Sequence, residues 1–383
     1  MYRLDEEQTA VLEEVCRVAD ESIAPHASDV DAQGRFPREA VDALAKAGLL
    51  GLTVPVEHGG MGHGVRVACA ALDEISQRCS STAMIYLMHL CGCSCYVAHT
   101  HAVEETLRQV ARGEHLTTLA WSEKGSRSHF WAPVSQAAQS NGRVVLNAEK
   151  SFVTSAGEAE GYVVSTRTAG GEEPTDITLY LMLKEDEGFT VSGRWDGMGM
   201  RGNASAPMTL EDCEIPAESA LCEPSDGFRT ILEVVMPWFN LGNAAVSVGI
   251  AEASTSATRS HLTSARLEHL GISLCGLPNL RARLARMRVE TDRARAHLAG
   301  VIDAVENPSP NTVLLVLESK VAAAETAREV AELGMQACGG AAFSRHLSVE
   351  RNFRDVHAAS VMAPTSDVLY DFIGKALCGM ELF

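Results

Sequence analysis

Four short segments combine glycines, hydroxyl side chains and aromatic residues in patterns that could bind a cofactor. The first, residues 119–128 (LAWSEKGSRS), follows an apolar run and ends in a loop of small residues. Backbone N–H groups and hydroxyls in such a loop can approach a phosphate or the edge of a ring. The other three are 150–156 (KSFVTSA), 197–205 (GMGMRGNAS) and 336–343 (QACGGAAF). Each alone is compatible with an ordinary loop or helix cap, so their order along the chain is what is informative.

Other patterns that could do chemistry lack the context that the chemistry needs. The glycine-rich residues 59–64 (GGMGHG) lie between predicted helices, whereas a dinucleotide fingerprint follows a strand. Cys91, Cys93 and Cys95 lie in one helical segment, whereas zinc sites usually take cysteine pairs from two segments. The sequence contains no P-loop, no serine-hydrolase elbow and no H-E-x-x-H pair. We therefore expect no metal site, and we do not expect a P-loop NTPase, a serine hydrolase or a zincin metalloprotease.

The elements that must position these segments change character twice along the chain. Residues 1–112 show apolar residues at helical spacing, with helices predicted near 65–79 and 81–98. Residues 113–222 contain β-type runs between turn-forming clusters, which predicts a compact barrel or sandwich; the runs are 116–121, 143–146, 161–166, 177–183 and 189–191. Residues 223–383 return to long helices with apolar stripes. The predicted fold class is α+β: an N-terminal helical domain, a middle β-barrel domain and a C-terminal four-helix bundle.

Composition and charge restrict the class of protein further. The chain has 383 residues, of which 46% are hydrophobic and 21% charged, as is usual for a globular protein of two or three domains. Its formal net charge of −18 would repel a phosphate backbone, so nucleic acid is not an expected partner. We see no apolar run of roughly 18 residues, the length needed to span a bilayer, and no secretion signal. Eleven scattered cysteines indicate reduced thiols, so we expect a cytoplasmic protein.

In this order, and on this layout, the four segments resemble those of the acyl-CoA dehydrogenase superfamily of flavoproteins. The similarity covers essentially the whole chain and includes residues 4–8 (LDEEQ), 23–25 (IAP) and 54–55 (VP). The resemblance implies an FAD-dependent oxidoreductase that acts on an acyl thioester, bound to CoA or to a carrier protein. It also implies a homodimer or homotetramer, because the FAD site of this family is shared between protomers.

The resemblance assigns the flavin ring to residues of the middle domain. Trp121 and Ser122 would lie along the pyrimidine edge of the isoalloxazine, and Ser128 would reach the pyrophosphate. Phe152 would stack against the ring, and Thr154 would form a hydrogen bond near N5. Such an apolar ring site with a few hydrogen bonds is what tunes a flavin.

Residues of the C-terminal domain match the family's contacts to the rest of the cofactor. Gln336, Gly339 and Gly340 match the stretch that contacts the adenosine half of FAD across a subunit boundary. Thr365 matches a threonine beside the flavin, and Asp367 matches the polar residue two positions later. The implied FAD site therefore draws on both the middle and the C-terminal domains.

The chain departs from the family at the position of the catalytic base. The reaction needs a carboxylate that removes the α-proton of the thioester while the β-hydrogen leaves as hydride to the flavin. The family carries this glutamate before a Gly-Thr pair, where this chain has Ala363, or on the first bundle helix, where it has Phe239. By position, Trp238 and Asn240 would line the substrate cavity. No catalytic residue is assigned.

Three readings of the missing base stay open. The enzyme oxidises an acyl thioester, with an unassigned base or with a substrate acidic enough to need less help. Alternatively, it is a flavin-dependent monooxygenase on the same fold, in which reduced flavin reacts with O₂. In the third reading it is a redox-neutral or non-catalytic thioester-binding relative. Asp367 shares a helical face with Ala363, but we interpret it as a cofactor contact or a helix N-terminal acid. The matching redox partners would be an electron-transfer flavoprotein or a flavin reductase.

Overall fold

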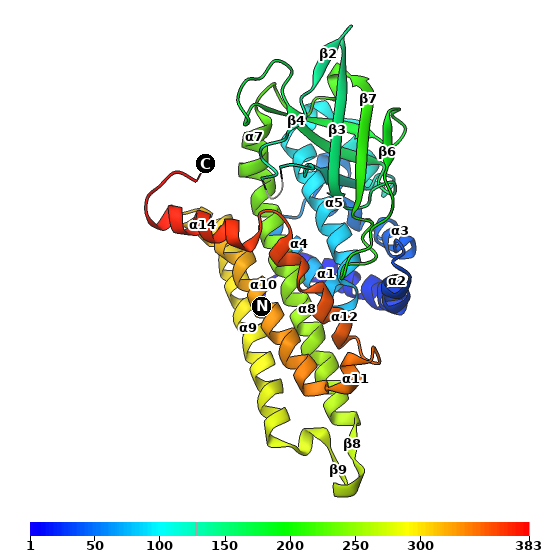
Figure 1. The fold of residues 1–383 in the computed structure, drawn as a ribbon, viewed down its shortest axis with the longest axis vertical. Coiled ribbons are helices and arrows are strands. Elements are labelled where there is room, and N and C mark those ends of the chain that lie inside the picture. The colour runs from blue at the N-terminus through cyan, green and yellow to red at the C-terminus, as the bar shows by residue number, and fades with distance from the viewer. Residues whose placement is uncertain (127–128, 383) are drawn as a thin grey trace.

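The computed structural model describes residues 1–126 and 129–382, which form three successive parts of an elongated molecule. Figure 1 shows the strands of the middle part at one end and three long helices that extend to the other end, where a short strand pair lies. The helices of the N-terminal part lie beside both, so the three parts meet near the middle. This arrangement confirms the predicted order of helical, β and helical parts.

The N-terminal part consists of helices, of which the first packs on the fourth, and the fourth and sixth pack on the fifth. These helices are α1 (Glu6–Val18), α2 (Ala27–Gln33), α3 (Arg38–Lys46), α4 (Val65–Arg78), α5 (Ser80–Ala98) and α6 (Glu104–Ala111). The first begins at a capping box, in which Asp5 and Gln8 each accept a hydrogen bond from the other's backbone N–H. Helix α5 is buried on all sides and contacts α4, α8 and β1. It therefore links all three parts.

The middle part contains two sheets. One has the order β1-β4-β5, with β1 parallel to β4; its strands are β1 (Thr117–Ala120), β4 (Gly161–Arg167) and β5 (Ile177–Leu183). The other is antiparallel with the order β2-β3-β7-β6; its strands are β2 (Ala138–Ser140), β3 (Arg143–Val153), β6 (Phe189–Val191) and β7 (Ala206–Pro216). Isolated bridges between Glu123 and Lys150 and between Gln136 and Arg167 join the sheets. The sheets therefore close toward a flattened barrel.

Three long helices run side by side in the C-terminal part (Figure 1): α8 (Met236–Ser264), α9 (Pro278–Glu306) and α10 (Thr312–Cys338). Before α8 come α7 (Gly227–Arg229) and a π-helical turn, Thr230–Val235. The shorter elements are β8 (Arg266–Leu267), β9 (Ile272–Ser273), α11 (Gly340–Phe343), α12 (Val349–Asp355), α13 (Ala358–Val361) and α14 (Ser366–Leu377). The fourth bundle helix that the sequence predicts is α14, which has 12 residues and lies across the end of α10.

Two helical segments correct one expectation from the sequence. Ser80–Ala98 and Gly227–Ser264 are long and apolar enough to cross a membrane by length and composition, although the sequence reading found no such run. In the structure, the most apolar 18-residue stretches of these two segments are 89% and 83% buried inside the protein. Packing in the core therefore accounts for their hydrophobicity.

Candidate functional site

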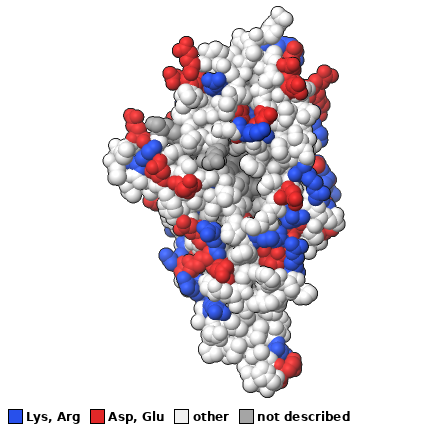
Figure 2. All heavy atoms as spheres, in the orientation of Figure 1, with Lys and Arg blue, Asp and Glu red and all other residues white. Residues whose placement is uncertain are grey.

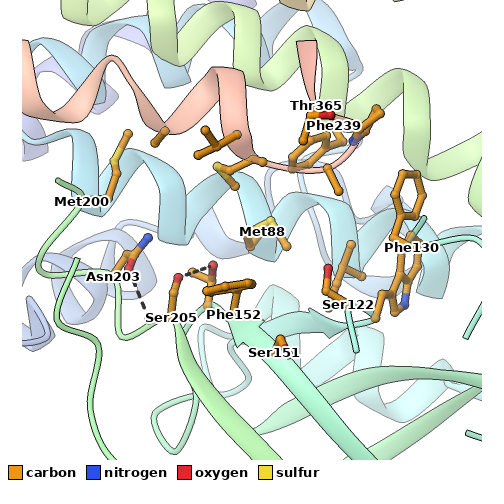
Figure 3. Close-up of a pocket in the computed structure, with 18 of the residues that line it drawn as sticks. Met88, Ser122, Phe130, Ser151, Phe152, Met200, Asn203, Ser205, Phe239 and Thr365 are labelled. Atoms are coloured by element: carbon orange, nitrogen blue, oxygen red, sulfur yellow. Dashed lines mark hydrogen bonds between the residues drawn. The ribbon is translucent and has the colours of Figure 1, made fainter. Parts of the chain in front are cut away.

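A cavity of about 640 Å³ lies where the β sheets, α5, α8 and the segment 358–365 meet. Its wall is mostly apolar, and Figure 3 shows Met88, Phe130 and Phe239 around it together with Ser122 and Thr365. Figure 2 shows that acidic and basic side chains are interspersed over this face of the molecule, with a largely uncharged hollow near its middle. Cavities of roughly 300–1,000 Å³ with a few polar groups are typical of small-molecule sites. This cavity is therefore the candidate site.

Trp121 and Ser122 reach the cavity because strand β1 ends one residue earlier, at Ala120. The Trp121 ring stacks on Phe130, with 6.1 Å between ring centroids and 13° between the planes. The indole N–H of Trp121 is buried and has no acceptor among the described residues. Because buried donors are almost always paired in folded proteins, this one indicates a missing partner. An acceptor on the edge of a bound ring would satisfy it.

Phe152 and Thr154 reach the cavity from an irregular end of β3. The pairing of β3 with β7 shifts between Lys150 and Val153, and Phe152 has a φ of 56°, which turns its side chain away from the sheet. The Phe152 side chain is 69% exposed and meets the ring of Trp195 edge-on, at 6.3 Å. The Thr154 hydroxyl is buried, 3.0 Å from the Ser205 hydroxyl. An exposed aromatic face beside buried hydroxyls suits a planar ligand with a polar edge.

The acidic residue in the cavity wall, Glu123, is occupied by other groups. Its carboxylate accepts hydrogen bonds from the Lys150 ammonium at 2.6 Å and from the backbone N–H groups of Val134 and Ser135. Burial by itself would raise the pKa of Glu123, but the charge of Lys150 and these hydrogen bonds hold the pKa below its usual value. Glu123 is therefore a structural ion-pair partner and a poor proton acceptor.

The helical wall contains Phe239 and Ala363, the residues that the sequence predicts at the two positions of the family's base. Neither side chain can accept a proton. The predicted substrate contacts Trp238 and Asn240 flank Phe239 on α8 but do not line the cavity, because successive helical residues point about 100° apart. Asn240 is fully buried, and its amide has no partner among the described residues.

Thr365 lies in the cavity wall at the N-terminus of α14, and Asp367 lies just beyond it. The Thr365 hydroxyl donates a hydrogen bond to the Asp367 carboxylate. This bond is the main reason why the pKa of Asp367 is lowered from its usual value, and the backbone N–H groups of Asp367 and Val368 add to it. A carboxylate that is bound in this way is weakly basic, so the geometry favours the reading of Asp367 as a helix N-terminal acid.

The structure does not bring every predicted cofactor residue to the cavity. Gln336, Gly339 and Gly340 lie at the end of α10 and the start of α11, on the side of the molecule away from the strands of the middle part (Figure 1). The Gln336 side chain donates a hydrogen bond to Glu332. Ser128, the predicted pyrophosphate contact, falls outside the described residues. Of the predicted cofactor residues that the structure describes, those that line the cavity are Trp121, Ser122, Phe152, Thr154 and Thr365.

Three ionisable residues in the wall, Lys124, Arg354 and His357, were not assigned to the site from the sequence. Arg354 is paired with the carboxylates of Asp31 and Glu350. His357 packs edge-on against Phe353, at 5.3 Å, and burial lowers its pKa, helped by the charge of Arg328. Arg354 lies on α12, and His357 lies three positions later in the turn before α13; their spacing upstream of Ala363 is the signal that could have found these two.

The chain matches all three domain descriptions of one family. The N-terminal, middle and C-terminal domains of acyl-CoA dehydrogenases match residues 5–114, 118–213 and 225–378. The probable acyl-CoA dehydrogenase FadE25 of Mycobacterium tuberculosis is 26% identical over 381 residues, covering 98% of this chain and 97% of its own. The probable acyl-CoA dehydrogenase YngJ of Bacillus subtilis is 28% identical over 380 residues, covering 98% and 99%.

Solved structures share the fold along the whole chain. Butyryl-CoA dehydrogenase from Megasphaera elsdenii superimposes with a TM-score of 0.92 at 23% identity, covering 98% of this chain and 99% of its own. The prolyl acyl carrier protein oxidase AnaB gives a TM-score of 0.88 at 20% identity, covering 98% and 99%. At these identities the two structures establish the arrangement of elements and not the reaction.

Proposed function

Because the chain belongs to the acyl-CoA dehydrogenase family of FAD-dependent oxidoreductases, we propose that its cavity takes the flavin ring of FAD and an acyl thioester, with no carboxylate placed to remove the α-proton. The observation that carries this proposal is the composition of the cavity wall. Trp121, Phe152 and Thr154 line one side of the cavity, while Phe239 and Ala363 occupy the other.

The residues present fit an isoalloxazine ring. The unpaired indole N–H of Trp121 would donate to the pyrimidine edge, where Ser122 also lies. Phe152 would lie against the ring, and Thr154 would hydrogen-bond near its central nitrogen. Thr365 and Asp367 would approach the same cofactor from α14. When bound, FAD supplies a two-electron acceptor.

Positions outside the cavity fit a site that is shared between protomers. Gln336, Gly339 and Gly340 would serve the adenosine half of a neighbouring protomer's FAD, which is why we propose a homodimer or homotetramer. Light scattering of the purified chain measures this directly, and a monomer at all concentrations would contradict it.

All eleven cysteines are free in the structure, as a reducing, cytoplasmic setting would require.

The protein's own contribution to the reaction is then binding, orientation and exclusion of water. Met88, Met236, Phe239 and Met362 give the acyl group an apolar, adaptable surface. A missing general base typically lowers a rate by about 10²–10⁴-fold. The proposed substrate is therefore a thioester whose α-proton is more acidic than that of a simple saturated acyl group.

Reconstitution with FAD tests this proposal. The protein should take up FAD and turn yellow, and an activated acyl thioester should bleach the flavin absorbance anaerobically. Butyryl-CoA, with its weakly acidic α-carbon, should reduce the flavin far more slowly. Protein that stays colourless with excess FAD, or is bleached rapidly by butyryl-CoA, would contradict the proposal.

The missing carboxylate also favours a second candidate, a flavin-dependent monooxygenase, because that reaction needs no α-proton base. The two candidates differ in their redox partners. The monooxygenase needs a flavin reductase and consumes O₂, whereas the dehydrogenase passes electrons to an electron-transfer flavoprotein or to oxygen. Substrate-dependent O₂ uptake that requires a reductase would favour the monooxygenase. A redox-neutral or non-catalytic relative would bind FAD or thioester without either signal.

A further inference from the structure

Lys320 is a buried lysine that contacts Phe239 and the two residues on either side of Ala363. It lies on α10 and is 1% exposed. Its ammonium group donates to the carbonyl oxygens of Met362 and Pro364, each at 2.6 Å. These two carbonyls bracket Ala363. The ammonium nitrogen also lies 5.3 Å from the centroid of the Phe239 ring. One side chain therefore joins α8, α10 and the segment between α13 and α14.

The segment 362–364 has few attachments of its own. The N–H of Met362 makes the last backbone bond of α13, to Ala358, and the first backbone bond of α14 runs from Leu369 to Thr365. In the described part of the chain, Lys320 donates to two of the three carbonyls between these bonds, those of Met362 and Pro364. Segments with few backbone hydrogen bonds open locally at low free-energy cost. The position of this segment therefore depends on Lys320.

Burial of Lys320 is unfavourable unless its hydrogen bonds are needed. No carboxylate among the described residues lies within ion-pair distance of it. Its neighbours on α10, Leu317 and Val321, belong to an apolar cluster with Leu369 and Phe372 of α14. A buried lysine without an anion costs free energy, whether it keeps its charge or gives up its proton, whereas an apolar side chain of similar length would pack there without that cost. The two carbonyl contacts are what a lysine provides and an apolar residue does not.

We propose that Lys320 is a positioning residue, which holds the segment 362–364 against the bundle and thereby places Ala363 and Thr365 in the cavity wall. The nature of the ligand that this wall faces rests on the proposed function. The attachment of the segment 362–364 by Lys320 does not. Loss of the two donors would leave one buried carbonyl and one partly buried carbonyl without these hydrogen bonds and release the segment.

Hydrogen–deuterium exchange of the full-length chain, with and without FAD, tests the proposal. In Lys320→Met, peptides within 358–369 should exchange about tenfold faster, because the segment loses its two hydrogen bonds. Peptides from α9, residues 278–306, should be unchanged. Lys320→Arg keeps the charge and the donors and should retain most of the protection. Lys375→Met, on α14, is the matched control and should exchange as the wild type does. If Lys320→Met does not fold, Lys320→Gln, which cannot reach both carbonyls, is judged by the same criteria.

Several outcomes would overturn the proposal. Unchanged exchange in the Lys320→Met segment would show that the segment does not need the lysine. Equally faster exchange in α9 would make Lys320 a general core residue, and equal loosening in Lys320→Arg would assign the effect to volume. A second readout is the dissociation constant for FAD, which should rise several-fold in Lys320→Met and not in Lys375→Met. A wild type that binds no FAD would refute the proposed function and leave the exchange result standing.

Discussion

At the scale of single residues, the proposed site is defined by Ala363 and Phe239, which the resemblance to the family assigns to the positions of its base. Both side chains line the cavity, and neither carries an acid group. The other carboxylates nearby are bound, Glu123 by Lys150 and Asp367 by Thr365. The described cavity therefore offers no free carboxylate to a substrate.

Ala363→Glu should introduce flavin reduction by butyryl-CoA, because it places a carboxylate in the cavity wall at the customary position. The rate should rise by about 10²–10⁴-fold over wild type, the usual contribution of a general base. Anaerobic stopped-flow absorbance measures it. Ala363→Gln has nearly the same volume and no base, so equal rates in the two variants would mean that position 363 does not face the α-carbon.

Phe152→Ala should weaken FAD binding without affecting folding, because the ring is 69% exposed and lies on the cavity wall. Loss of an aromatic contact worth about 1 kcal/mol raises the dissociation constant about fivefold. Fluorescence titration with FAD gives this value. Val289→Ala removes an exposed side chain on α9 and serves as the control. Equal FAD affinity in Phe152→Ala and wild type would place the ring elsewhere.

Lys320 should make stability depend on pH in a defined window. Burial lowers its pKa from 10.5 to about 7. Between pH 7 and about 10 the unfolded chain therefore binds a proton that the folded chain does not, and stability rises with pH. The difference in unfolding free energy between wild type and Lys320→Met should increase by about 1.4 kcal/mol per pH unit. Urea unfolding at pH 7, 8 and 9 measures it, and a constant difference would mean that Lys320 keeps an ordinary pKa.

At the same scale, the sequence identified residues that belong to recognisable segments and missed those that act through the fold. Trp121, Phe152, Thr154 and Thr365 stand in motifs, and the structure brings them to one cavity. Lys320 stands in an otherwise ordinary helix, and its contacts with Met362 and Pro364 span more than forty positions of the chain. Only the tertiary structure reveals such a partner.

At the scale of elements, the periodicity of the sequence located helices better than strands. Strands β5 and β6 match their predicted runs, but β7 (Ala206–Pro216) was not predicted. Its residues alternate between buried and exposed. They include Glu211, Asp212 and Glu214, which make the segment less apolar than the predicted strands. Strand β3 continues beyond the predicted run 143–146, because residues 148–153 pair with β7, which is distant in sequence.

Close packing between α4 and α8 should make Gly249 intolerant of a side chain. A Cβ atom there would lie 1.9 Å from the Ser76 hydroxyl oxygen and 2.3 Å from the Asp73 carbonyl oxygen. Gly249→Ala should therefore lower the free energy of unfolding by about 1–3 kcal/mol. Gly300→Ala, on α9 with nothing within 4 Å, should instead raise it by about 0.5–1 kcal/mol. Urea unfolding distinguishes the two, and equal stability in Gly249→Ala and wild type would mean that α4 and α8 are further apart.

At the scale of the whole molecule, the order of the three parts could be predicted because each has its own periodicity. The way in which the three parts pack together could not be predicted, because it depends on the tertiary contacts of α5 and on the crossing of α14 over α10. The distance of Gln336 from the cavity also depends on the tertiary structure and could not be predicted. A cofactor site that is completed by a neighbouring protomer would require this separation.

A structure of the FAD-reconstituted protein with a bound acyl-CoA tests the central claim most directly. The account predicts a flavin ring in contact with Trp121, Phe152 and Thr154, with Ala363 and Phe239 on the opposite side of the acyl group. It also predicts no carboxylate oxygen within about 3 Å of the substrate carbon beside the flavin. A carboxylate at that distance, or a flavin bound outside this cavity, would contradict it.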